Sequence, residues 1–349
     1  MSRYPLPMPY GWFQICWPED LPAGHTLPLF YFDRHLVAWR DEDGGAHLMD
    51  AFCPHMGTHL GYGARVDGCN IVCPLHSWTY DADGNNVDIP YSDKVNRAAT
   101  IRTYPVMERN GLVMAWYHPE GIEPQWDMPE LEAFSGSDDF GAPIHKQYRV
   151  NTHWQEIAET TVDAAHVQAH LVRYERELFD GQAEPITAPD VESYEVDGPV
   201  TRMRFAQRFP TPMGVMDGRI DTDAYGPGLA VTAFTGVVDT YLLGCAIPVD
   251  AETTEVRFTF AVRSLGDAAA TASVGEAFAE EIHTQTVKDV PIWENKAYLP
   301  KPMLSKDDGP IMQFRRWAEQ FYAEGVEKGP QVWAPRAPAE QPEPQPSLV

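Results

Sequence analysis

The chain has 349 residues, 26 Lys and Arg against 51 Asp and Glu, and a formal net charge of −25. Its 44% hydrophobic and 22% charged residues are typical of a folded globular protein, and the length allows two domains. The acidic balance argues against nucleic acid and against an anionic membrane surface as partners, because both need clusters of Lys and Arg.

The first third of the chain predicts a small antiparallel β domain, which we place at residues 8–118. Short runs of apolar and β-branched residues alternate with turns rich in Gly and Asp. Strands are expected at 29–32, 35–39, 46–52 and 111–117. A stretch rich in Pro, Gly and acidic residues follows over 119–144 and is expected to connect two domains.

The second half predicts a mixed α+β domain at residues 145–328. Helices are expected at 154–170, 268–295 and 311–323, with strands between the first two over 190–265. The long helix is expected to begin near Ser273 and to be interrupted at Pro291. The last residues, 329–349, are rich in Pro and are predicted to form an extended tail.

Two short motifs each combine a cysteine with a histidine. One residue separates Cys53 from His55, and two residues separate Cys73 from His76. A structural zinc ion accepts such a ligand set, but zinc fingers usually pair Cys with Cys and His with His. One Cys and one His on each loop instead suit a 2Fe–2S cluster in which two His replace two Cys on one iron.

A second group of metal-binding side chains is predicted on the helix at 154–170. Asp163, His166 and His170 follow one another at i, i+3 and i, i+4 spacing, so they share one helical face. Two imidazoles and a carboxylate from elsewhere form the facial triad of non-heme Fe(II) oxygenases. Zinc hydrolases also place two His at i, i+4, but they carry a Glu directly after the first His, where this chain has Val167.

The two loops, CPHMGTHLGYG and CPLHSWTYDADG, resemble the ligand loops of the Rieske family. This resemblance covers about residues 10–118 and implies an all-β domain that holds a 2Fe–2S cluster. It implies that Cys53 and Cys73 bind one iron and that His55 and His76 bind the other. Cys69 has no place in the pattern.

The later segments resemble the helix-grip catalytic domain of Rieske non-heme iron oxygenases. The segment at 285–296 is most similar to the branch of ketosteroid 9α-hydroxylases and cholesterol desaturases. The resemblance implies that a mononuclear Fe(II) is bound by three side chains, His166, His170 and Asp289. Glu281, Glu294 and Asp307 are the other candidates for the carboxylate ligand.

The helix departs from the family pattern at two points. Three residues separate His166 from His170, where many members have four. Thr160 and Thr161 stand where many members carry an Asn upstream of the Asp. The shorter spacing also occurs in the family, so the two His remain the predicted ligands.

The resemblance implies the terminal oxygenase component, which uses O₂ to hydroxylate a hydrophobic, steroid-like or polycyclic substrate. Electrons from NAD(P)H would arrive through a separate reductase, with or without a ferredoxin, since this sequence carries no dinucleotide-binding fingerprint. Aromatic-ring dioxygenation, oxidative O- or N-demethylation and a pure Rieske electron carrier are the alternatives. Strands at 203–209 and 229–243 are expected to line an apolar pocket.

The resemblance also implies a head-to-tail homotrimer in which the two metal centres of neighbouring subunits lie side by side. Asp163 is then expected to connect them. Its carboxylate would accept a hydrogen bond from the free ring nitrogen of His166 and would meet the partner subunit's His76.

Three features of the sequence bear on its location. No apolar run is long enough to span a membrane, and the first residues do not have the pattern of a secretory signal. The count of 5 Cys is odd, which agrees with reduced thiols. We therefore expect a cytoplasmic protein.

Overall fold

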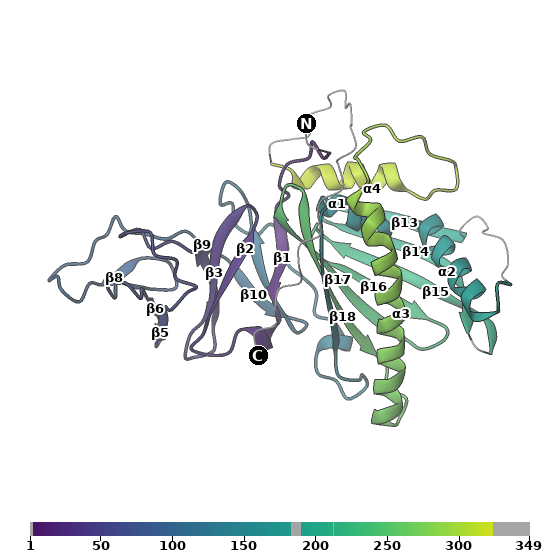
Figure 1. Ribbon diagram of the computed structural model, residues 1–349, viewed down its shortest axis with the longest axis horizontal. Coiled ribbons are helices and arrows are strands. Elements are labelled where there is room, and N and C mark those ends of the chain that lie inside the picture. Colours follow the sequence, from purple (N-terminus) through teal and green to yellow (C-terminus); the bar gives the residue numbers. More distant parts are fainter. Residues whose placement is uncertain (1–2, 183–189, 212, 324–349) are drawn as a thin grey trace.

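The computed structural model describes residues 3–182, 190–211 and 213–323. Three small antiparallel sheets from the first part of the chain lie at one end of the molecule, and one large sheet with helices on its face lies at the other (Figure 1). In the described residues no helix is both long enough and apolar enough to cross a bilayer. The predicted tail at 329–349 lies outside the described residues.

The strands of the first part form three sheets. In spatial order these are β1 (Gly11–Cys16), β11 (Leu112–Tyr117) and β10 (Val106–Arg109); β2 (Thr26–Tyr31), β3 (Arg34–Arg40), β4 (Ala46–Asp50) and β9 (Thr103–Tyr104); and β5 (Arg65–Asp67), β6 (Asn70–Val72), β7 (Thr79–Tyr80) and β8 (Asn86–Asp88). Short 3₁₀ turns, η1 (Pro18–Asp20) and η2 (Glu132–Phe134), lie outside the sheets. The predicted strands at 29–32, 35–39, 46–52 and 111–117 correspond to β2, β3, β4 and β11.

The second part is built on a seven-stranded antiparallel sheet. Its spatial order is β12 (Ile144–Val150), β18 (Thr253–Val262), β17 (Thr240–Asp250), β16 (Ala230–Thr235), β15 (Gly214–Tyr225), β14 (Val200–Thr211) and β13 (Asp190–Asp197). The long helix α3 (Ala268–Glu294) crosses this sheet, and α2 (Ala164–Leu178) lies near β14 (Figure 1). The predicted α+β class, with an all-β domain before a helix-grip domain, is confirmed.

The helix expected at 154–170 is divided in two. The chain forms α1 (Trp154–Ala158) and a 3₁₀ turn, η3 (Glu159–Thr161), before α2 begins. The prediction of one continuous helix was wrong because Asp163 ends that segment. Its Oδ1 accepts a hydrogen bond from the backbone N–H of His166 at 2.9 Å, which makes it the N-cap of α2.

The bounds of α3 agree with the helix predicted at 268–295, but the start expected near Ser273 and the interruption expected at Pro291 were wrong. The helix begins at Ala268 and not near Ser273, because the side chain of Asp267 accepts a hydrogen bond from the Ala270 N–H and caps it. Pro291 does not interrupt the helix. It lies in the last turn, where its missing N–H removes one bond near the helix end. After α3 come α4 (Ile311–Ala318) and η4 (Glu319–Phe321).

A buried ion pair joins η3 to α4. The Arg315 guanidinium donates from Nε and Nη2 to the two oxygens of Glu159, at 2.7 and 2.9 Å, and both side chains are less than 8% exposed. Gln155 donates to the same carboxylate, and the Tyr322 hydroxyl donates to Gln155. This network fixes the segment that leads into α2.

Breaking this pair should destabilise the protein strongly. Arg315→Met leaves the Glu159 carboxylate buried without its partner, and we expect a loss of about 3–5 kcal/mol in the free energy of unfolding. Arg219→Met is the matched control, since Arg219 makes the same two-bonded contact with Glu192 at an exposed site. It should cost at most about 1 kcal/mol. Denaturant unfolding measures both, and equal losses would contradict the prediction.

Candidate metal centres and substrate pocket

Cys53 and Cys73 each begin a five-residue turn with the same backbone geometry. The N–H of Gly57 donates to the Cys53 carbonyl at 2.8 Å, and the N–H of Ser77 donates to the Cys73 carbonyl at 3.0 Å. Both Gly57 and Ser77 have a positive φ, at 76° and 57°. The two loops therefore present their side chains in similar ways, although their sequences space Cys and His differently.

The thiols of the two loops are buried, while the imidazoles lie nearer the surface. Cys53 and Cys73 are 1% and 2% exposed, whereas His55 and His76 are half-buried. The two His rings are 4.8 Å apart. Nδ1 of His76 is buried with no hydrogen-bond partner among the described residues, which is costly unless a ligand satisfies it. Two thiols, two imidazoles and this unpaired nitrogen fit a 2Fe–2S cluster.

Neighbouring aromatic side chains hold these loops. The His55 ring stacks on Trp78, with 4.3 Å between ring centroids and 6° between planes. The Tyr80 hydroxyl lies 3.2 Å from Sγ of Cys53. Burial raises the pKa of Tyr80, so the phenol keeps its proton and can donate it to a thiolate. Tyr80 was missed by the sequence reasoning, because a tyrosine in a short strand carries no signal of its own.

The two other residues near these loops have separate partners. The thiol of Cys69 is exposed and donates to Asp43 at 3.3 Å. Nδ1 of His59 accepts a hydrogen bond from the Gly61 N–H at 3.0 Å. Neither residue is needed for the ligand set described above.

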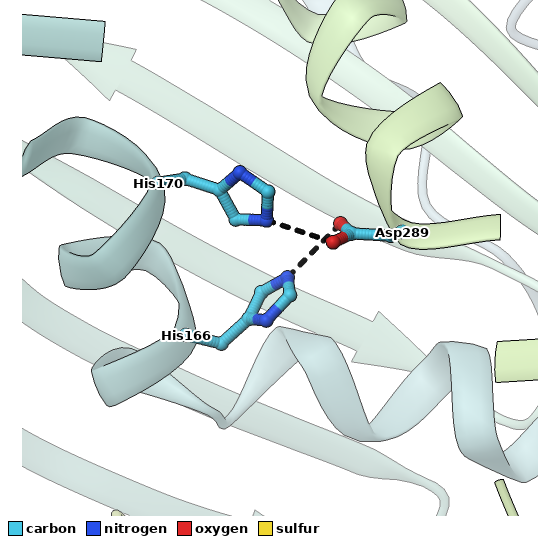
Figure 2. Close-up of side chains that lie close together, drawn as sticks. All are labelled: His166, His170 and Asp289. Carbon is cyan, nitrogen blue, oxygen red and sulfur yellow. Dashed lines mark hydrogen bonds and ion pairs between the residues drawn. The ribbon is translucent and has the colours of Figure 1, made fainter. Parts of the chain in front are cut away.

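A second group of side chains that could hold a metal ion lies where α2 faces α3. Asp289 on α3 points between His166 and His170 on α2 (Figure 2). Nε2 of His166 is 3.1 Å from Asp289 Oδ2, and Nε2 of His170 is 2.9 Å from Oδ1. One ligand atom from each residue lies within 4.8 Å of the others. The three side chains named from the sequence are thus brought together by the fold.

The environment of this group suits a divalent cation. His170 and Asp289 are both 5% exposed. Burial raises the pKa of Asp289, but the hydrogen bonds and charges of His166 and His170 outweigh it and hold the pKa below its usual value. The carboxylate is therefore ionised. Two imidazoles and one carboxylate can hold a non-heme iron and leave positions open.

The other acidic candidates are engaged elsewhere. Glu281 accepts a hydrogen bond from Gln285, and Glu294 accepts one from Asn151, each at 2.9 Å. Asp307 is exposed and lies in a loop, where its N–H donates to the Ser305 hydroxyl. Of the four acidic residues, the geometry therefore favours Asp289 as the carboxylate ligand.

Asp163 makes a contact different from the expected one. In the described structure its side chain accepts a hydrogen bond from the backbone N–H of His166 and not from the His166 ring. Burial raises the pKa of Asp163, although this hydrogen bond opposes the shift. The sequence signal for the cap was present, since Asp is a preferred N-cap residue.

A largely apolar cavity adjoins the group of Figure 2. It is lined by the sheet and by α2, α3 and α4, including Phe205, Ile220, Leu229, Phe234, Leu242, Phe258, Ile282, Trp293 and Trp317. Several of these lie on the strands expected to line a pocket. Among the described lining residues, the only acidic or basic side chains other than the Cys245 thiol are those of His166 and Asp289. An apolar ligand placed here would lie against the two helices that carry the metal-binding group.

Two family models match successive parts of the chain. The model of the Rieske [2Fe-2S] domain matches residues 11–105, and that of the 3-ketosteroid 9alpha-hydroxylase C-terminal domain matches residues 115–322. The chain belongs to the Rieske oxygenase family. It is therefore an iron–sulfur oxidoreductase of the oxygenase class, and the resemblance noted in its loops and helices is confirmed.

Curated relatives extend over most of this Rieske oxygenase. The oxygenase component of 3-ketosteroid-9-alpha-monooxygenase from Rhodococcus rhodochrous is 30% identical over 328 residues, covering 90% of this chain and 81% of that protein. Cholesterol 7-desaturase nvd from Xenopus laevis is 30% identical over 337 residues, covering 90% of this chain and 72% of that protein.

Solved structures share the fold at lower identity. The caffeine complex of NdmA from Pseudomonas putida has a TM-score of 0.71 and 19% identity, covering 90% of this chain and 92% of that one. Dicamba monooxygenase bound to dicamba has a TM-score of 0.70 and 16% identity, covering 89% and 96%. These two enzymes support the architecture and not a substrate.

Proposed function

We propose that this protein is a terminal oxygenase component that hydroxylates a neutral, hydrophobic, steroid-like substrate. The observation that carries the proposal is the apolar cavity beside His166 and Asp289. A charged substrate would need an opposite charge in this cavity, because burying an unpaired charge is costly. The relatives named above are a ketosteroid monooxygenase and a cholesterol desaturase, which agrees with a neutral polycyclic substrate.

We assign the ligands of both metal centres as follows. Cys53 and Cys73 bind one iron of the 2Fe–2S cluster, and His55 and His76 bind the other. The facial triad of Figure 2 binds the mononuclear Fe(II). When bound, the two centres would supply electron transfer and O₂ activation. The protein's own part is to orient the substrate and to exclude water from the cavity.

The electrons need a partner protein. The sequence carries no dinucleotide fingerprint, so we propose that NAD(P)H is oxidised by a separate reductase, with or without a ferredoxin. The half-buried His55 and His76 would place one edge of the cluster near the surface, where an electron carrier can approach.

Other reactions on this scaffold are less well supported. Ring dioxygenation and oxidative demethylation would use the same two centres, so only substrate chemistry separates them from hydroxylation. A pure Rieske electron carrier would have no use for the group formed by His166, His170 and Asp289. Iron content separates the carrier from an oxygenase, at about two against about three irons per chain.

Removing the carboxylate should empty the mononuclear site and leave the cluster. Asp289→Ala deletes one of three protein ligands, so we expect iron to fall from about three to about two per chain and product formation to stop. Glu294→Ala, on the same helix, should keep both iron and activity. Iron analysis, with the visible absorbance of the cluster, measures the effect. Full iron occupancy in Asp289→Ala would contradict the ligand assignment.

We further propose that Asp163 bridges the electron-transfer path between subunits of a head-to-tail trimer, between His166, whose backbone N–H it binds, and the partner subunit's His76. Asp163→Asn keeps an N-cap, because Asn caps as well as Asp, but it removes the charge. Electron transfer from the reduced cluster to the iron should slow by about 10–100-fold or more in a single turnover. Asp267→Asn, the same change at the cap of α3, is the control. Normal transfer in Asp163→Asn, or an active monomer, would contradict this route.

The substrate class is tested with the purified protein, a reductase and NADH. We compare a four-ring ketosteroid, an aromatic carboxylate and an N-methylated purine, and we measure substrate-dependent O₂ and NADH consumption and product mass. We expect the ketosteroid alone to gain one oxygen atom, because the described cavity wall carries no Lys or Arg that could pair with a carboxylate and is otherwise largely apolar. Turnover of the carboxylate or demethylation of the purine, without steroid turnover, would refute the proposal.

A further inference from the structure

The sheet beneath the cavity carries one pair of facing hydroxyl groups. Thr222 on β15 lies directly opposite Thr232 on β16, and their Oγ1 atoms are 3.0 Å apart. Both residues line the cavity. Thr222 is 4% exposed and Thr232 is half-buried, so water does not surround the pair. The two strands belong to the large sheet, one face of which is covered by α2 and α3 (Figure 1).

The sheet side chains that line the cavity next to the pair are apolar. Because side chains on one face alternate along a strand, the next rows on this face are two residues away. On one side the row holds Phe205, Ile220 and Phe234, and on the other it holds Ala224, Ala230 and Gly244. Among the described sheet residues that line the cavity, only the two threonines carry a side-chain oxygen.

Counting hydrogens shows that this pair has a donor to spare. Each threonine hydroxyl has one hydrogen and can accept as well. The bond between Thr222 and Thr232 uses one of the two hydrogens. Among the described residues, neither hydroxyl has a side-chain hydrogen bond other than this one. The second hydrogen is therefore available to a ligand in the cavity.

The other hydroxyls on the cavity wall are already used. Thr160 donates to the Ile157 carbonyl at 2.6 Å, Thr161 to that of Ala158 at 2.8 Å, and Thr286 to that of Ile282 at 2.8 Å. The amide nitrogen of Gln285 donates one of its two hydrogens to Glu281. Nε1 of Trp317 is a second buried donor without a partner among the described residues, and the experiment below separates it from the pair.

We propose that Thr222 and Thr232 form the subsite that binds a carbonyl or hydroxyl oxygen of the substrate. The spare hydrogen donates to a ketone, and the hydroxyls can rotate to accept from an alcohol. A hydrocarbon of the same shape would leave the buried donor unsatisfied, which weakens its binding. The inference rests on the proposed function, since it names the polar group that an otherwise apolar, neutral substrate should carry.

The test measures binding without turnover. The full-length protein with both metal centres is kept oxidised, without reductase or NADH, and equilibrium dialysis gives the dissociation constants of a saturated steroid ketone and of the same steroid without oxygen. The wild-type protein should bind the ketone about tenfold more tightly. Thr222→Val with Thr232→Val should bind both probes equally, whereas Thr222→Ser with Thr232→Ser should keep the preference.

Two single variants serve as controls. Thr286→Val removes a hydroxyl of the same cavity whose hydrogen is already used, so the preference should remain. Trp317→Phe should also keep it, since the indole is not the assigned donor. The absorbance of the cluster reports whether each variant is folded. If the double valine variant loses this absorbance, the single variants Thr232→Val and Thr232→Ser are compared instead. Thr232→Val should then lose part of the preference for the ketone, and Thr232→Ser should keep it.

The inference is overturned by any of three results: no preference in the wild-type protein, a full preference in the folded double valine variant, or loss of the preference in Trp317→Phe. A failure of the proposed function appears elsewhere, as the absence of steroid-dependent O₂ consumption in the complete enzyme system. The two failures are therefore distinguishable.

Discussion

The carboxylate of Asp289, held between His166 and His170, is the contact on which the catalytic region depends. It joins two helices whose residues here are 123 and 119 positions apart in the chain. Buried polar side chains that form hydrogen bonds with one another avoid the free-energy cost of burying unpaired polar groups. The same contact keeps α2 and α3 facing each other, and it defines one edge of the apolar cavity.

Local capping aligns the two helices for this contact. Asp163 starts α2 three residues before His166, and Asp267 starts α3. Because each residue advances a helix by a fixed rotation, the start of α2 sets which face carries the two His. Behind α2, the buried pair of Glu159 and Arg315 holds the preceding turn against α4. The positions of His166, His170 and Asp289 are thus set by polar contacts that lie outside this group.

The two proposed centres have opposite surroundings. In the first, the thiols are buried and the imidazoles lie nearer the surface, which would let electrons enter from a partner protein. In the second, the carboxylate and His170 are buried beside an apolar cavity, whose walls would keep water from the part of a substrate that they cover. This contrast fits a protein that accepts electrons from outside and uses them in an apolar site.

The sequence by itself determined what depends on residues close together in the chain. The Cys–His pairs of the two loops and the helical spacing of His166 and His170 were readable because their geometry is local. The α+β class followed from the patterns of apolar residues and from the family resemblance.

Tertiary structure decided whatever depends on distant partners. It ended the first helix at Asp163, carried α3 through Pro291, and distinguished Asp289 from Glu281 and Glu294 by their different hydrogen bonds. It also set Thr222 opposite Thr232. The register between two strands determines which side chains lie together on the floor of a cavity, and this register cannot be read from either strand alone.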